Sequence, residues 1–389
     1  MSGQELSARP VHILHLHSSF SLGGKEARAV RLMNAFGDRA RHTIVSGVPD
    51  QLSARDAIAK GIKYEIAQDP PSLTGKPSVA RYDAIARYMR RFDLVLSYNW
   101  GAIDAVMARR VFGASTKGGA LPPLIHHEDG FNADEARRLN PVRNMYRRLA
   151  LPAAHALVVP SHVLEGIART AWKQPAARLR RISNGIDTAR YAAKPNPRAI
   201  PGLVKRANET VIGTVAGLRE VKDIPMLVRA CGGLSGNVRL VIVGEGPEKQ
   251  KIMDAGEAMF FDDYMVMPGF MNDPAKWIGL FDIFALSSKS EQQPIAVMEA
   301  MAAGLPVVAP PVGDVREMVS EPNRTHITDD HFEVHLRDSM QFLIDHRDVR
   351  RAIGKANQTR AQALFDESAM IAAYAELYGA AMGHPGALI

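Results

Sequence analysis

The sequence contains a single cysteine, Cys231, and no apolar run near the ~20 residues that a membrane-spanning helix needs. One cysteine excludes a disulfide within the chain and a cysteine-based zinc site, as is typical of a reducing compartment. The first ten residues lack the basic start and apolar core of a signal peptide, so we expect a cytoplasmic protein. With 389 residues, 46% hydrophobic and 23% charged, the chain is predicted to fold into two domains.

The charge is unevenly distributed along the chain. Residues 1–200 carry a net charge of +14, whereas residues 201–389 carry −7. A basic half predicts an anionic partner, which could be nucleic acid, an anionic membrane surface or a phosphorylated acceptor. The alternative is that scattered arginines only keep the protein soluble.

Ten short apolar runs rich in β-branched residues alternate with amphipathic helix patterns, five before residue 160 and five after residue 209. Continuously apolar strands are typical of parallel sheets covered on both faces. One doubly wound sheet has about five or six strands, so the pattern predicts an α/β protein with two Rossmann-like doubly wound domains. Three prolines and a glycine within 192–203 predict the boundary. The expected domains are 1–192 and 193–365, followed by a helix and tail at 366–389 that pack back toward the first domain.

Two glycine-containing turns follow predicted strands. Gly23 and Gly24 precede a helix, where backbone N–H groups favour a phosphate or a sugar, although a turn without a ligand fits equally well. Gly244 and Gly246 resemble part of a dinucleotide-binding fingerprint, but the third glycine position is Lys249. We interpret the second pair as a tight strand-to-helix turn.

The most specific segment is 287–309. Pro294 fits the first turn of a helix on which Glu299 is a lone carboxylate among apolar residues. A buried carboxylate needs a partner, which is either the hydroxyl groups of a ligand or a neighbouring lysine or arginine. Glu291 lies just before this helix, where the free N–H groups from Gln292 onward would suit a diphosphate.

Arginines alternate with apolar residues in 137–152. The pattern favours an anionic bilayer surface over a nucleic acid, because no aromatic platform accompanies the charges, and a solvated face is the alternative. The basic residues of this segment are Arg137, Arg138, Arg143, Arg147 and Arg148.

In their order, these motifs resemble the retaining GT-B glycosyltransferases of family 4, and the resemblance covers nearly the whole chain. The family's signature has two glutamates separated by seven residues, here Glu291 and Glu299. The matching segments are GGKE at Gly23–Glu26, SNGID at Ser183–Asp187, GTVAGLREVKD at Gly213–Asp223, EAMAAGLPVVA at Glu299–Ala309 and VGDVREMV from Val312. The resemblance implies that the two domains face a cleft.

The resemblance also implies a donor site. Glu299 would hold the nucleotide ribose, Glu291 would contact the donor sugar, and Lys222 would bind the diphosphate. The full set of donor-binding residues is Gly23, Gly24, Arg219, Lys222, Glu291, Gln292, Gln293, Pro294 and Glu299. The family places an arginine where this chain has Gly217, and Arg219 is the nearest replacement.

The family further has a histidine near the end of an N-terminal strand, facing the donor sugar. His126 is the first candidate and His127 the second, so the expected catalytic residues are His126, His127 and Glu291. A metal site that includes Glu128 and Asp129 is a weaker interpretation, since adjacent residues rarely converge on one ion.

By this resemblance, the protein is a hexosyltransferase that uses a nucleotide sugar, with UDP as the favoured nucleotide and no cofactor or metal. The acceptor would be a lipid, a lipid-linked glycan or a polysaccharide precursor of the cell envelope, reached at the inner face of the cytoplasmic membrane. No nucleic acid partner is expected. Two alternatives stay open: a GT-B sugar-nucleotide epimerase, and a non-catalytic protein that binds nucleotide sugars or anionic lipids.

Overall fold

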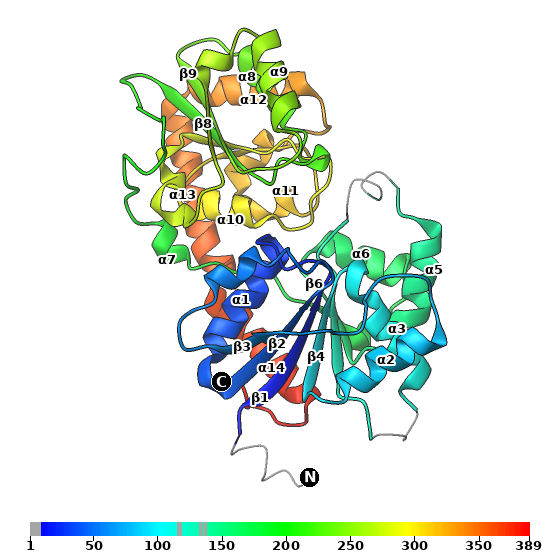
Figure 1. Ribbon diagram of the computed structural model, residues 1–389. Coiled ribbons are helices and arrows are strands. Elements are labelled where there is room, and N and C mark those ends of the chain that lie inside the picture. Colours follow the sequence, from blue (N-terminus) through cyan, green and yellow to red (C-terminus); the bar gives the residue numbers. More distant parts are fainter. Residues whose placement is uncertain (1–8, 115–118, 132–134, 136–137) are drawn as a thin grey trace. The chain divides into compact units, whose positions relative to one another are not determined.

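The computed structural model describes residues 9–114, 119–131, 135 and 138–389. The chain divides into two compact units, each with its own parallel sheet (Figure 1). Unit 1 comprises the chain up to Gly130, Leu139–Asn184 and Ser368–Ile389. Unit 2 comprises Phe131–Arg138 and Gly185–Glu367. Together with the solved structures reported below, this architecture confirms the predicted α/β fold with two Rossmann-like units.

Unit 1 is built on a seven-stranded parallel sheet in the order β3-β2-β1-β4-β5-β6-β7. The central strands are buried on both faces, which explains their continuously apolar sequences. The strands are β1 (Val11–His17), β2 (Ala40–Ser46), β3 (Lys63–Ile66), β4 (Leu94–Tyr98), β5 (Leu124–His127), β6 (Ala156–Val159) and β7 (Leu179–Arg181).

Helices cover the sheet of unit 1. Leu32 and Phe36 of α1 share one apolar cluster with Tyr374 and Tyr378 of α14, so these two helices pack against the same sheet. The N-terminal ends of α2, α5 and α6 are capped by Ser78, Asn140 and Ser161, whose side chains accept backbone N–H groups. The helices are α1 (Gly24–Phe36), α2 (Val79–Met89), α3 (Ile103–Phe112), α5 (Pro141–Ala150), α6 (His162–Thr170) and α14 (Glu367–Ala381).

Unit 2 has a five-stranded parallel sheet in the order β10-β9-β8-β11-β12. Its strands are β8 (Thr210–Val215), β9 (Val238–Val243), β10 (Met265–Gly269), β11 (Ile283–Ala285) and β12 (Val307–Val308). Its helices are α7 (Thr188–Tyr191), α8 (Ile224–Gly232), α9 (Lys249–Ala258), α10 (Ile295–Ala302), α11 (Val315–Met318), α12 (Glu333–Asp345) and α13 (Arg347–Leu364). Because β8 and β11 are adjacent and parallel, the loops that follow them lie at the same edge.

The ten apolar runs correspond to β1, β2, β4, β5, β6 and β8–β12. The sequence pattern did not predict β3 and β7, which lie at the two edges of the first sheet. Their residues are mostly exposed and polar, so no apolar run marks them.

The division between the units falls before the proline-rich segment. Ile186, Tyr191, Ile200 and Leu203 all belong to an apolar cluster of unit 2. The expected boundary within 192–203 is therefore too late, because this segment packs as part of unit 2 and does not behave as a linker. Among the described helices, none has both the length and the apolar character needed to cross a bilayer.

Candidate functional site

Two residues of unit 2 lie together: Lys222, which is expected to bind the diphosphate, and Glu291, which is expected to contact the donor sugar. Lys222 ends a short 3-10 helix after β8, and Glu291 lies between β11 and α10. Their side chains form an ion pair and are only 16% and 11% exposed. The Ser288 hydroxyl also donates a hydrogen bond of 2.6 Å to Glu291 Oε1. Lys222 and Glu291, which are 69 positions apart in the sequence, are thus neighbours at the carboxyl edge of the sheet.

Several hydrogen bonds fix the two loops that carry this pair. The Ser287 hydroxyl donates to the Lys222 carbonyl at 2.8 Å, and the Lys289 N–H donates to the Val221 carbonyl at 2.8 Å. Lys289 also lies 3.4 Å from Asp223, whose backbone is left-handed with φ of +46°. Lys289 is a second cation near the site that the sequence analysis missed.

Glu299 lies on α10 with 9% of its surface exposed. The Tyr191 hydroxyl donates to Glu299 Oε1 at 2.7 Å. This phenol is one hydrogen-bond partner of the Glu299 carboxylate.

Gln292 and Gln293 are buried beside Glu291, and the following helix begins at Ile295. Pro294 therefore precedes α10, whereas the sequence placed it in the first turn; its carbonyl accepts the Val297 N–H at 3.1 Å. Gly313 has φ of +53° and packs closely against this loop. A Cβ at this position would lie only 2.3 Å from the Gln292 carbonyl oxygen, so there is no room for a side chain.

Arg219 is exposed and lies beside Gly217. The Arg219 side chain lies close to Gly217. A Cβ built on Gly217 would lie 3.7 Å from Arg219 Nε. The neighbouring Gly244 and Gly246 have φ of +144° and +154° and pack against this loop. A Cβ on Gly246 would lie 2.4 Å from the Leu218 carbonyl oxygen, which agrees with a tight turn.

In unit 1, Gly23 and Gly24 lie at the start of α1. Gly23 has an extended backbone with φ of −147°, which any residue adopts. The Glu26 carboxylate lies over this end of the helix, because Glu26 Oε2 is 3.0 Å from the position of a Cβ on Gly23. Burial raises the pKa of Glu26, and its ion pair with Lys25 counteracts part of that rise.

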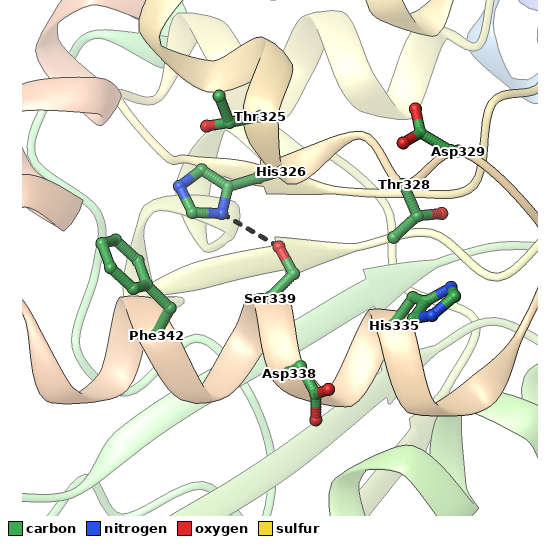
Figure 2. Close-up of a pocket in the computed structure, with 8 residues that line it drawn as sticks. All are labelled: Thr325, His326, Thr328, Asp329, His335, Asp338, Ser339 and Phe342. Carbon is green, nitrogen blue, oxygen red and sulfur yellow. Dashed lines mark hydrogen bonds between the residues drawn. The ribbon is translucent and has the colours of Figure 1, made fainter.

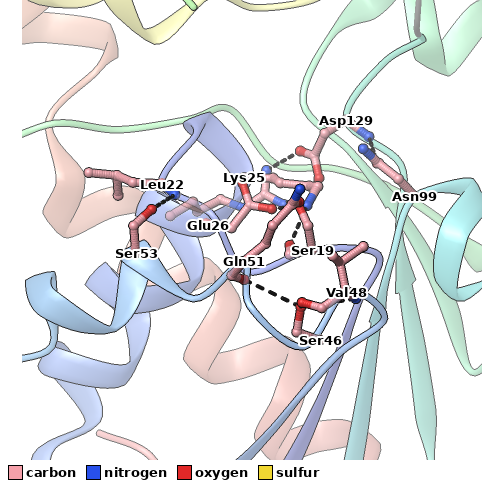
Figure 3. A network of polar contacts seen from close by, with 11 residues as sticks. Ser19, Leu22, Lys25, Glu26, Ser46, Val48, Gln51, Ser53, Asn99 and Asp129 are labelled. Atoms are coloured by element: carbon pink, nitrogen blue, oxygen red, sulfur yellow. Dashed lines mark hydrogen bonds and ion pairs between the residues drawn. The ribbon is translucent and has the colours of Figure 1, made fainter. Parts of the chain in front are cut away.

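A buried ion pair lies next to this turn (Figure 3). The Arg28 guanidinium, 3% exposed, donates to both carboxylate oxygens of Asp129, which follows β5. Arg28 also donates to Asn184 Oδ1 at 3.1 Å. From the sequence, Asp129 was a candidate only as a metal ligand; the described residues hold no cluster suited to a metal ion.

His126 and His127 are fully buried inside unit 1. Nδ1 of His126 shares a hydrogen bond of 2.8 Å with the Ser97 hydroxyl, and Nε2 of His127 shares one of 2.9 Å with the Tyr378 hydroxyl. The expectation that one of them faces the donor sugar stays a prediction. Side chains on adjacent strand residues point to opposite faces of a sheet, and both faces are covered here.

The arginines of α5 have different environments. Arg147 is 1% exposed, donates to Glu128 Oε1 at 2.9 Å, and lies over the rings of Trp100 and Trp172. Its expected place on a surface is therefore wrong, because its charge is paired inside unit 1.

The other arginines of this segment differ in exposure. Arg143 is half-buried over Trp100, Arg148 is exposed, and Arg138 is exposed in a segment of unit 2. Arg137 lies outside the described residues. Beside them, Val142, Met145 and Leu149 of α5 are 77%, 52% and 54% exposed. Their spacing of three and four residues places them on one face of the helix, and we call them the α5 apolar stripe.

A hollow of about 450 Å³ lies on unit 2 between the segment Thr325–Asp329 and α12 (Figure 2). Asp329, Asp338 and Phe342 line it, and no predicted donor-binding residue does. Neither lysine nor arginine is among its lining residues, so the hollow does not suit a diphosphate.

Two family models match consecutive parts of the chain. The model described as Glycosyltransferase Family 4 matches residues 22–190, and the model described as Glycosyl transferases group 1 matches residues 209–346. The second match contains the Lys222–Glu291 pair and Glu299.

The chain belongs to the family 4 glycosyltransferases, with the GT-B fold.

Curated relatives and solved structures resemble this family 4 glycosyltransferase. N-acetyl-alpha-D-glucosaminyl L-malate synthase of Bacillus anthracis is 21% identical over 374 residues, which are 92% of this chain and 94% of the relative. A GDP-mannose-dependent alpha-mannosyltransferase of Mycobacterium tuberculosis is 28% identical over 176 residues, 45% of each chain. The structure of Anabaena Alr3699/HepE in complex with UDP-glucose has a TM-score of 0.75 at 20% identity, over 95% of this chain and 100% of that one.

The buried histidines of unit 1 predict that the glycosyltransferase is sensitive to acid. His17, Tyr98 and His127 stack in a row, and His15 contacts both His42 and Tyr98. Burial lowers the pKa of His42 to about 4, and it lowers the pKa values of His15, His17 and His127 well below 6.5.

We predict that stability is fully present above pH 6.5 and is lost as the pH falls toward 4. The unfolded histidines bind protons from about pH 6.5, while the folded ones stay neutral. The pKa of His42 alone corresponds to about 3 kcal/mol. Urea midpoints between pH 7.5 and 4.5 measure the loss. His42→Gln should reduce this slope; equal slopes for the variant and the unaltered protein would contradict the prediction.

Proposed function

We propose that this glycosyltransferase transfers a hexosyl group from a UDP-sugar to a lipid, a lipid-linked glycan or a polysaccharide precursor, with retention of configuration. The observation that carries the proposal is the Lys222–Glu291 ion pair, which joins two loops of unit 2. Glu299 lies on α10, the helix that follows the second of these loops. The complexes of Anabaena Alr3699/HepE with UDP and with UDP-glucose support the choice of donor.

Bond cleavage leaves negative charge on the departing diphosphate. We propose that Lys222 exchanges its partner Glu291 for this diphosphate, which frees the Glu291 carboxylate for the donor sugar. Arg219 supplies a second charge from its position beside Gly217, in place of the arginine expected there. Fixed cations in a partly buried site stabilise such charge without a metal ion.

Glu299→Gln should weaken binding of UDP-glucose about tenfold or more. A carboxylate accepts two hydroxyl groups of a ribose, whereas an amide offers one acceptor oxygen and a weaker, uncharged bond. Calorimetry measures the affinity, with Glu317→Gln as control, since Glu317 is exposed on the neighbouring α11. Unchanged affinity in Glu299→Gln would remove Glu299 from the ribose site. The absence of UDP-glucose binding by the unaltered protein would refute the proposed donor class.

The acceptor is proposed to lie at an anionic membrane surface, which unit 1 approaches through the α5 apolar stripe. Three exposed apolar side chains on one helix face, next to the exposed Arg148, form the pattern of an interfacial helix. The net charge of +14 in residues 1–200 adds attraction to anionic lipids. Because Arg147 is buried, the proposal rests on the α5 apolar stripe and not on all the arginines of 137–152.

Val142→Asp should weaken binding to phosphatidylglycerol vesicles about tenfold, because it removes an apolar contact and adds a repelled charge. Val204→Asp is the matched control, since both valines are 77% exposed and Val204 belongs to unit 2. Co-sedimentation across a salt series measures the binding, which should weaken with salt as screening increases. Equal pelleting of the two variants, or indifference of the unaltered protein to lipid charge, would favour a soluble acceptor.

A further inference from the structure

Phe260 of unit 2 projects into solvent from a left-handed backbone. It is 90% exposed and its φ is +51°, a conformation that bulky residues rarely adopt. It follows α9, where the Phe261 N–H donates to the Gly256 carbonyl at 2.9 Å. This bond is typical of a helix end whose left-handed residue is glycine. Phenylalanine therefore strains the backbone here, while its ring gains little free energy from burial in return.

Three exposed carboxylates lie within three residues of Phe260 in the sequence. They belong to Glu257, Asp262 and Asp263, and none forms an ion pair or a side-chain hydrogen bond within the described part of the chain. We call these three residues and Phe260 the α9 patch. The patch lies at the amino edge of the unit 2 sheet, because α9 ends and β10 begins there.

A second exposed phenylalanine of unit 2 lacks this surplus of negative charge. Phe332 is 62% exposed and precedes α12. The carboxylates beside it have partners, because Asp330 lies 2.6 Å from His335 Nδ1 and Glu333 accepts a hydrogen bond of 2.7 Å from Arg229. The α9 patch is therefore distinguished by its unpaired charges as well as by its exposed ring.

Unit 1 presents a surface of the complementary kind. The α5 apolar stripe is exposed, and α5 contains no acidic residue. Arg148 of this helix is exposed, and its Nε donates to the Ala171 carbonyl at 2.7 Å. Arg169 and Lys173, on either side of Ala171 in the chain, are also exposed, and none of the three cations pairs with a carboxylate of a described residue. An apolar surface with a cationic edge fits an aromatic ring with an anionic edge.

We propose that the α9 patch of one copy of this chain binds the α5 apolar stripe of a second copy, with Phe260 as the central contact. A second copy is the occupant that the charges favour, since residues 1–200 carry +14 and residues 201–389 carry −7. The contact joins two different surfaces, so copies associate head to tail, in a chain or a closed ring.

The contact leaves the donor site free, because the α9 patch lies at the opposite edge of the sheet from Lys222 and Glu291. It rests on none of the proposed chemistry. It does use the stripe that the proposed function assigns to a membrane, so anionic vesicles and a second copy compete for this surface. Vesicles should therefore dissociate the assembly.

Sedimentation velocity of the full chain across a concentration series tests the contact. The unaltered protein should form species larger than the monomer by about 100 µM at low salt, and added salt should shift it toward the monomer. Phe260→Gly should weaken association about tenfold or more, as the loss of a central aromatic contact does. Glycine suits the left-handed position, so the urea midpoint of this variant should be no lower than that of the unaltered protein. Phe332→Gly is the matched control and should associate as the unaltered protein does.

Mixing two variants tests which surfaces meet. Val142→Asp alters the stripe and leaves the α9 patch intact, so alone it should also stay monomeric. A mixture of Val142→Asp with Phe260→Gly contains one intact patch and one intact stripe. The mixture should therefore form a complex of two chains that grows no further, because both remaining surfaces are altered.

Three results would overturn the inference: a monomeric unaltered protein at about 100 µM, equal association by Phe260→Gly and Phe332→Gly, or a mixture of the two surface variants that stays monomeric. If the unaltered protein is monomeric and binds only anionic vesicles through the stripe, the membrane proposal stands and this inference fails. If copies associate as described but ignore lipid charge, the membrane proposal fails and this inference stands.

Discussion

The ion pair between Lys222 and Glu291 is the interaction on which the proposed donor site depends. It joins the loops that follow two adjacent parallel strands, and both side chains are mostly withdrawn from water. A pair of this kind gains little net stability, because desolvation of the charges offsets most of their attraction. Removing one partner is costly, however, so Lys222 favours any anion that replaces Glu291. In our account, the diphosphate of the donor is that anion, and Glu291 is released toward the sugar.

Both units hold paired charges near the carboxyl edge of their sheets. In unit 2, Lys222 pairs with Glu291, and Lys289 lies 3.4 Å from Asp223. In unit 1, Lys25 pairs with Glu26, and Arg28 pairs with Asp129. In our account, the Lys222–Glu291 pair is the one that a diphosphate opens.

The sequence predicted those features that a local pattern encodes. Buried strands are continuously apolar, so ten of them were found, while the exposed edge strands β3 and β7 carry no such signal. Glu291 and Glu299 belong to a compact motif, and the parallel sheet brings Lys222 to Glu291. Tyr191 has no motif of its own and reaches Glu299 only through folding.

In unit 1, the expectations for the histidines and for Arg147 had different sources. The apolar pattern indicated a sheet covered on both faces, whereas the family resemblance placed His126 or His127 toward the donor sugar; both side chains are buried within the unit. Asp129, two residues beyond β5, is where the chain leaves the sheet and becomes accessible. Arg147 was assigned to a surface because arginine is usually exposed, yet Glu128 and two tryptophan rings bury it.

The central claim is that Lys222 recognises the diphosphate and not the nucleoside. The most direct measurement compares the affinities of UDP and uridine for the unaltered protein and for Lys222→Met by calorimetry. We expect UDP binding to weaken about 10- to 100-fold in the variant, while uridine binding does not change. If UDP and uridine lose affinity equally, or if neither does, Lys222 does not bind the diphosphate and the account of the donor site is wrong.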